Sequence, residues 1–465
     1  MILYTFNQFH AVRPFLNKGK PMNLYAIIGP LLAFIPLNEG FLVSPPNFRK
    51  LSPSKNQSTF KYVPNNLKRF PDLKDPTKLA SSIGIVDTVF DPEHDKIRKQ
   101  VFRAPHDPNS GAIGMPIVLD MLGEGQVNVG AIQSIYKPDF TRFSRIDAMI
   151  SENMTVDWQD ARWYLKKKSD RKFLNEYAQY SHASHGTHVA GVSIKDNPKA
   201  KLLSIRFIHE FVYTFSQEQK RSVDAAENKK LLSSAIEAGI AENLNKMIFG
   251  LQQRYMSLAS VANQFKIDVL NLSLGTPPGR VVVDNILAMN NLYLSEEKIS
   301  NLAQQYDHAI GDIVRMCILQ SPNTVFVFAA GNEETNVDNV PYLYHVAKHP
   351  RGIVVGAVDQ NHDFADFSNH GGASVNIAAE GVNIPSSSPG NGLLYMSGTS
   401  MAAPAVTHAV ARLIDLGLAP ANVKQILMET ATRYPQLKTH VESGVLNEKA
   451  ALRKARKLLG KRAQT

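Results

Sequence analysis

Met396–Pro404 reads MSGTSMAAP, and the rest of the chain can be interpreted outward from it. Gly398 permits a close approach of two backbone segments, and Pro404 suits the first turn of a helix, where a missing N–H costs little. We therefore predict that a helix begins at Ser400. The Ser400 N–H would be one of the unsatisfied donors of that terminus, and the helix dipole would favour an anion beside it. A serine that merely caps a helix would have similar neighbours.

A histidine that could activate this serine lies upstream, in HGTHVAG at residues 185–191. A hydroxyl is a weak nucleophile unless an imidazole accepts its proton and a third group orients the imidazole. We expect His185 at an exposed turn before a helix. His182 and His188 extend a spacing of three residues that could also indicate a metal site. No HExxH pattern or interleaved carboxylate supports that alternative, and Gly186 argues against a regular helix through all three histidines.

An aspartate ends the apolar run IGIVD, residues 83–87, which is typical of a buried strand in a parallel sheet. Functional groups gather at the carboxyl ends of such strands. A buried carboxylate also needs a partner, and an imidazolium would be suitable. Asp87 could instead cap the following turn. Asp91 and Asp95 are nearby alternatives, but neither ends an apolar run.

A side-chain amide ends a further apolar run, NTVFVFAAGN at residues 323–332. An asparagine at this place could simply adopt a left-handed turn after a strand. Asn332 could also present its amide at the same edge of the sheet as the aspartate and the histidine.

These four stretches together resemble the catalytic motifs of the subtilisin-like (subtilase) serine peptidases. The chain order Asp, His, Ser is the subtilisin order. The resemblance implies a serine endopeptidase in which Asp87, His185 and Ser400 form the catalytic triad and react through an acyl-enzyme. It also implies that Asn332 donates a hydrogen bond to the oxyanion. A catalytically silent pseudopeptidase that binds peptides or a partner through the same cleft is the alternative.

Further stretches extend the resemblance over roughly residues 80–455. The run IDVLNLSLG at 267–275 resembles the substrate-binding edge strand of the family. Its last residues would pair with the substrate backbone as an added strand. The family usually has Gly where Val89 stands and Pro where Glu380 stands, so both local turns depart from the pattern. The substrate-binding residues implied in this way are Ser273, Leu274, Gly275, Ala330 and Gly331.

The composition agrees with a large α/β core. The chain has 465 residues, of which 44% are hydrophobic, and its single cysteine, Cys317, excludes an intramolecular disulfide framework. Apolar runs alternate with long helical segments, so we predict a mostly parallel central sheet with helices on both faces. The resemblance implies that this is the subtilisin-like three-layer α/β fold. The expected strands are 83–86, 203–208, 267–272, 325–330 and 353–357. The peptidase domain at 80–455 would carry inserts at about 99–175, 216–263 and 279–320.

The formal net charge of +10 is concentrated at the two ends. Residues 1–80 hold 11 basic and 3 acidic residues, and 449–465 hold 7 basic and none acidic. Residues 81–448 hold 33 basic and 38 acidic residues, so the enzyme body is slightly acidic. We expect solvated ends, or contact with acidic lipid or protein surfaces. Nucleic-acid binding is not expected, because no aromatic platform accompanies the basic residues.

The terminal segments allow several expectations. Residues 1–40 resemble a signal peptide or a basic apolar arm, which favours export or secretion over a cytoplasmic location. Residues 41–79 carry six prolines and are expected to form an extended arm, and 456–465 a basic tail. The apolar stretch 24–35 is too short to span a membrane. Protein or peptide substrates are the expected partners, and no cofactor is expected in the chemistry. Structural calcium is common in the family, but no acidic loop marks a site.

Overall fold

The computed structural model describes residues 80–103, 116–121, 137–151, 154–207, 213–226 and 228–462. The arm predicted at 1–40 and the proline-rich segment predicted at 41–79 lie outside these residues.

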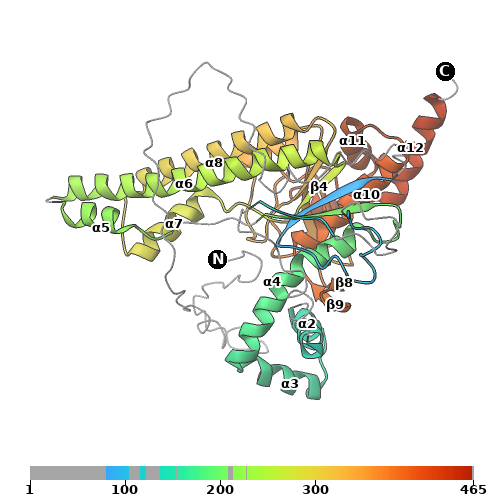
Figure 1. The fold of residues 1–465 in the computed structure, drawn as a ribbon, viewed down its shortest axis with the longest axis horizontal. Coiled ribbons are helices and arrows are strands. Elements are labelled where there is room, and N and C mark those ends of the chain that lie inside the picture. The colour runs from blue at the N-terminus through green and yellow to red at the C-terminus, as the bar shows by residue number, and fades with distance from the viewer. Residues whose placement is uncertain are drawn as a thin grey trace, which may run out of the picture. The chain divides into compact units, whose positions relative to one another are not determined.

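A seven-stranded sheet lies at the centre of the described residues (Figure 1). Its strands follow the order β2-β3-β1-β4-β5-β6-β7, and each neighbouring pair is parallel. A separate antiparallel hairpin is formed by β8 and β9. The bounds are β1 Ser82–Asp87, β2 Val118–Asp120, β3 Lys201–Arg206, β4 Val269–Leu272, β5 Val325–Ala329, β6 Gly352–Val358, β7 Ile377–Glu380, β8 Ile384–Ser388 and β9 Gly392–Met396.

Helices cover both faces of this sheet. Their bounds are α2 Pro138–Ser151, α3 Trp158–Lys168, α4 Arg171–Ser193, α5 Gln217–Asp224, α6 Lys229–Gln264, α7 Gly279–Asn290, α8 Glu296–Gln320, α9 Pro341–Lys348, α10 Thr399–Asp415, α11 Pro420–Thr430 and α12 Glu448–Arg462, with a 3-10 turn η3 at Pro435–Leu437. None of the described helices is both long and apolar enough to cross a lipid bilayer.

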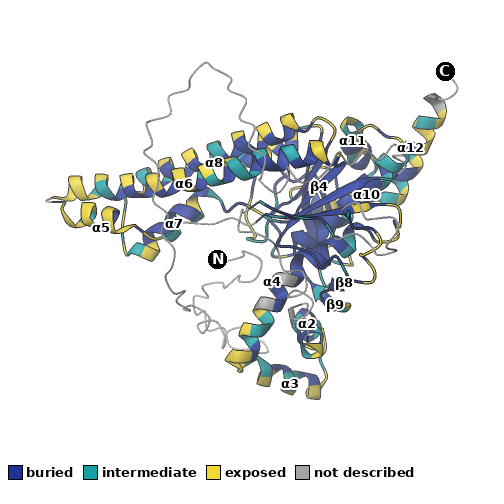
Figure 2. Cartoon of the chain, viewed as in Figure 1, coloured by how far each residue is buried: buried dark blue, intermediate teal, exposed yellow. Residues whose placement is uncertain are grey.

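Alternating strand residues build two separate cores, one on each face. Ile85 and Val327 belong to the cluster that packs against α4 and α10. Val86 and Phe328, their chain neighbours, belong to the cluster that packs against α6 and α8. Figure 2 shows the strands buried and the exposed residues along the outer sides of α6 and α8. Because both faces of the sheet are covered, its central strands carry apolar residues on both sides, as the sequence predicted. The three-layer α/β fold is confirmed.

The segments predicted as inserts are largely helical where the structure describes them. The described part of the first predicted insert holds α2, α3 and the start of α4, the second holds α5 and most of α6, and the third holds α7 and α8. The basic residues from 456 continue α12 as far as Arg462, so this part of the predicted tail is helical.

The prediction that 267–275 forms an edge strand is wrong. β4 lies in the middle of the sheet, paired with β1 on one side and β5 on the other. Its backbone donors and acceptors are therefore used within the sheet. Residues 273–275 continue past the carboxyl end of β4 and lie outside the strand.

α4 lies so close to the segment after β1 that replacing Gly186 by alanine should destabilise the protein. A Cβ on Gly186 would lie 2.3 Å from the carbonyl oxygen of Val89. We expect Gly186→Ala to lower the free energy of unfolding by about 1–3 kcal/mol, although alanine favours helices. The matched control is Gly250→Ala in α6, where a Cβ would meet nothing nearer than Arg254 at 3.8 Å. Gly250→Ala should raise the free energy of unfolding by up to about 1 kcal/mol, because alanine favours the helix more than glycine does. Equal effects of both changes in denaturant unfolding would contradict the packing argument.

Candidate active site

Asp87 and His185 form a buried hydrogen-bonded pair. Asp87 is the last residue of β1 and has no exposed surface, and its Oδ1 lies 2.7 Å from Nδ1 of His185. The same oxygen accepts the Thr88 N–H at 2.7 Å and the Thr88 hydroxyl at 3.1 Å. A carboxylate can only accept, so the imidazole proton lies on Nδ1 and the lone pair is on Nε2. This tautomer is the one that a general base requires.

His185 does not lie at an exposed turn, and that prediction is wrong. α4 runs without interruption from Arg171 to Ser193, and His185 is 3% exposed within it. The part of α4 that precedes His185 is stabilised by aromatic packing. The Tyr180 ring stacks on Phe140, with ring centroids 4.9 Å apart. Gly186 is accommodated because α4 approaches the β1 loop too closely for any side chain. The argument that a glycine would interrupt this helix gave too little weight to tertiary packing.

His188 anchors α4 to the β8-β9 hairpin. Its Nε2 lies 2.8 Å from the Ile384 carbonyl oxygen and 3.1 Å from that of Leu394, so this nitrogen is the donor. Burial lowers the pKa of His188 to about 4. His185 and His188 thus each use a ring nitrogen in a structural contact, and the described residues contain no group of three or more candidate metal ligands. His182 lies in the same helix.

Ser400 is the second residue of α10 and is 4% exposed. Its hydroxyl donates to the Ser273 carbonyl oxygen at 3.0 Å, and the Ser273 hydroxyl donates to the Ser400 carbonyl oxygen at 2.9 Å. Pro404 does not lie in the first turn as predicted, since it is the sixth residue of the helix. It lacks the N–H that would bond to the Ser400 carbonyl, and Ser273 supplies the missing donor.

The two halves of the predicted triad are not hydrogen-bonded to each other. His185 Nε2 is buried and, among the residues that the structure describes, has no hydrogen-bond partner. Catalytic hydrogen bonds are often absent in sites without substrate and form as the substrate binds. The Ser400 hydroxyl is bonded to the Ser273 carbonyl oxygen instead, and this bond would have to break before the hydroxyl could donate to the imidazole.

Asn332 is oriented by the helix that carries Ser400. Its Oδ1 accepts the Thr399 N–H at 2.8 Å and the Thr399 hydroxyl at 2.9 Å. A Cβ on Gly398 would lie 3.5 Å from the amide nitrogen and 3.6 Å from Oδ1, so the whole Asn332 amide packs against this glycine. Gly398 has φ 155°, outside the ordinary range of other residues. Sequence reasoning did not identify Thr399, although it lies inside the quoted motif.

The predicted substrate-binding residues lie on two neighbouring segments. Ser273 is buried, Leu274 is half-buried and Gly275 is exposed, just beyond the carboxyl end of β4. Ala330 and Gly331 follow β5, and the Gly331 N–H donates to the Thr399 hydroxyl at 3.2 Å.

Two buried polar residues that connect to Ser273 by hydrogen bonds, Asn271 and Thr407, were not identified from the sequence. Asn271 Nδ2 donates to the Ser273 hydroxyl at 2.9 Å, and the Thr407 hydroxyl donates to Asn271 Oδ1 at 2.9 Å. Pro404 was the available signal, because a proline four residues after Ser400 leaves a carbonyl that needs another donor.

Similarity to a known protein family extends over most of the chain. A profile of the Subtilase family matches residues 80–450. The chain belongs to the subtilase family. The thermophilic serine proteinase of Bacillus sp. (strain AK1) is 38% identical over 124 residues, 27% of this chain and 29% of that protein. Subtilisin DY of Bacillus licheniformis is 28% identical over 270 residues, 57% of this chain and 77% of that protein. A solved structure of the prenylagaramide maturation protease PagA has 19% identity and a TM-score of 0.38, covering 81% and 95% of the two chains.

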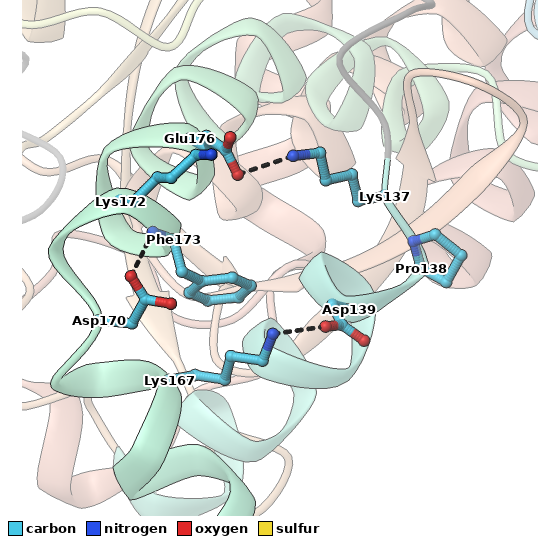
Figure 3. A pocket seen from close by; sticks show the side chains of 8 residues that line it. All are labelled: Lys137, Pro138, Asp139, Lys167, Asp170, Lys172, Phe173 and Glu176. Carbon is cyan, nitrogen blue, oxygen red and sulfur yellow. Dashed lines mark hydrogen bonds and ion pairs between the residues drawn. The ribbon is translucent and has the colours of Figure 1, made fainter.

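This subtilase also has a hollow of about 290 Å³ among α2, α3 and α4 (Figure 3). Lys137 pairs with Glu176 and Lys167 with Asp139, each at 2.7 Å, and Lys167 also lies 4.5 Å from the Phe173 ring centre. The charges of the hollow are therefore largely satisfied from within. Its lining contains none of the predicted catalytic residues.

The burial of His188 predicts a loss of stability in acid. The unfolded chain takes up this proton near pH 6.5, whereas the folded protein resists it until about pH 4. The free energy of unfolding should therefore fall as the pH drops from 6.5 to 4, by up to about 3 kcal/mol from this group. His188→Gln keeps an amide donor but cannot titrate, so denaturant unfolding of that variant should depend less on pH in this window. An unchanged pH dependence would contradict the assignment.

Proposed function

We propose that this subtilase is a serine endopeptidase. The observation that carries the proposal is the buried 2.7 Å contact between Asp87 and His185, in which His185 Nε2 has no hydrogen-bond partner among the residues that the structure describes. Ser400 lies at the start of a helix, where the backbone N–H and the dipole favour an oxyanion. Membership of the subtilase family supports the same reaction.

In the proposed reaction, His185 Nε2 accepts the Ser400 hydroxyl proton while the oxygen attacks the peptide carbonyl carbon. Asp87 holds the imidazole in place and stabilises the imidazolium. The Ser400 N–H and the Asn332 side-chain amide hold the oxyanion. His185 then gives its proton to the leaving amine, and an acyl-enzyme forms. A water molecule, deprotonated by the same imidazole, releases the carboxylic acid and restores Ser400.

Peptides and proteins are the proposed substrates. Leu274 and Gly275, which are partly or fully exposed, would pair with the substrate backbone, a mode that makes little demand on the substrate sequence. Side chains of this chain perform every proton transfer in the scheme, so it includes no cofactor. Structural calcium and export from the cell remain predictions.

A peptide-binding pseudopeptidase is the competing function. It would have the same fold and the same exposed segment after β4, but it would not need a base with a free lone pair beside the serine. The retained Asp87, His185, Asn332 and Ser400 favour the enzyme.

Covalent labelling separates the two functions. A serine-directed fluorophosphonate should modify Ser400, as mapped by peptide mass spectrometry, because this hydroxyl has a buried base and an oxyanion site nearby. Ser400→Ala should abolish both labelling and peptide hydrolysis. Peptide hydrolysis that persists in this variant would rule out the proposed nucleophile. A wild-type protein that binds peptides without labelling or cleavage would identify the pseudopeptidase.

Loss of the Asn332 amide should affect the transition state more than the substrate. We expect Asn332→Ala to lower kcat by about 10²–10³ with little change in KM, a magnitude that comes from the corresponding change in subtilisin itself. The control is Thr399→Ser, which keeps both groups that bind Asn332 Oδ1 and should remain close to wild type. A large rise in KM with kcat intact would assign Asn332 to substrate binding.

A further inference from the structure

The chain segment from Ser273 to Gly279 connects β4 to α7, and its middle is held by α9. The Tyr342 hydroxyl, on α9, donates to the Thr276 carbonyl oxygen at 3.1 Å in a buried contact. Tyr342 is 5% exposed, and its hydroxyl lies 4.0 Å from the position that a Cβ on Gly275 would occupy. Tyr342 therefore holds the backbone of Thr276 and also lies next to the exposed Gly275.

The far end of this segment is held by α8. Asp307 Oδ1 accepts the Gly279 N–H at 2.7 Å, at the first residue of α7. A negative carboxylate is favourable at a helix N-terminus, where N–H groups are unsatisfied. A Cβ on Gly279 would lie 2.2 Å from the Ala303 carbonyl oxygen, so the backbones of α7 and α8 are in close contact.

α8 also supports α9, so the two anchors are connected. A Cβ on Gly311, in α8, would lie 3.5 Å from the backbone nitrogen of Tyr342. The near end of the segment is held by α10, through the Ser273 hydroxyl. Leu274 and Gly275 therefore lie between fixed points, and their surfaces are partly or fully exposed.

We propose that Tyr342 and Asp307 are positioning residues, which hold Leu274 and Gly275 in place to bind the substrate backbone. The proposal rests on the proposed peptidase function and assigns a role to the third helical insert. α7 and α8 would then be the support of the substrate-binding segment. Neither side chain would touch the reacting atoms, so both would act on KM through the backbone that they hold.

A pair of tyrosine variants tests the first anchor. Tyr342→Phe removes one hydroxyl and leaves the Thr276 carbonyl without its donor. The matched control is Tyr306→Phe, because Tyr306 is fully buried in the same core and its hydroxyl has no hydrogen-bond partner in the described part of the chain. We expect Tyr342→Phe to raise KM for an extended peptide about tenfold, with kcat unchanged. Hydrolysis of a single amino-acid ester, which offers no extended backbone to pair with Leu274 and Gly275, should change much less. Tyr306→Phe should change neither the KM for the peptide nor the hydrolysis of the ester.

A second pair of variants tests the other anchor. Asp307→Ala removes the acceptor of the Gly279 N–H and should raise KM for the extended peptide in the same way. Asp307→Asn keeps a side-chain oxygen at this place and should restore most of the affinity.

Hydrogen exchange measures the anchoring without any substrate. Amide exchange within residues 273–279, followed by mass spectrometry, should be faster in Tyr342→Phe than in wild type and unchanged in Tyr306→Phe. Equal exchange in the two tyrosine variants would overturn the proposal, as would parallel losses on peptide and ester. A wild-type protein that neither labels with a fluorophosphonate nor cleaves peptides would refute the peptidase function separately, and the exchange result would still decide the anchoring.

Discussion

The hydrogen bond between Asp87 and His185 joins the central sheet to the helix layer, and the arrangement of the candidate site depends on it. A buried carboxylate without a partner is costly, so Asp87, at the end of β1, needs hydrogen-bond donors from its surroundings. α4 provides that donor from its interior, and Gly186 lets the helix approach closely enough to deliver it. The same contact selects the imidazole tautomer. One interaction thus connects packing, protonation and the proposed chemistry.

A second set of contacts organises the serine side of the site. The helix α10, which carries Ser400, begins between the ends of β4 and β5, and Ser273 and Asn332 each contact its first turn. Ser273 compensates for the N–H that Pro404 lacks, and Asn271 and Thr407 orient Ser273 from below. Ser273, Asn271 and Thr407 are buried, so each of their polar groups would be costly to leave unpaired. The backbone around Ser400 is therefore held in place before any substrate binds, whereas its hydroxyl still has to leave the Ser273 carbonyl.

Much of this could be predicted from the sequence because the informative signals are local. Asp87 ends a continuous apolar run, Asn332 follows another, and Ser400 begins a helix, which together predict a parallel sheet with polar groups at one edge. The errors arise where distant parts of the chain meet. Gly186 is compatible with a helix because of its contact with Val89, and β4 is central because of its neighbours β1 and β5. The support given by Tyr342 and Asp307 to residues 274–275 likewise involves chain segments that no local pattern connects.

The continuity of α4 also limits how this protein can change over evolution. The helix enters from the α2-α3 insert and reaches His185 about fifteen residues later without a break, and each added residue would turn the preceding part by about 100°. A deletion or insertion of one residue between Tyr180 and Ser184 would leave the imidazole bonded to Asp87 but rotate the Tyr180 ring away from Phe140. Length changes in this stretch should therefore be tolerated in steps of whole turns, and relatives that carry this insert should differ there by about four or seven residues rather than by one or two.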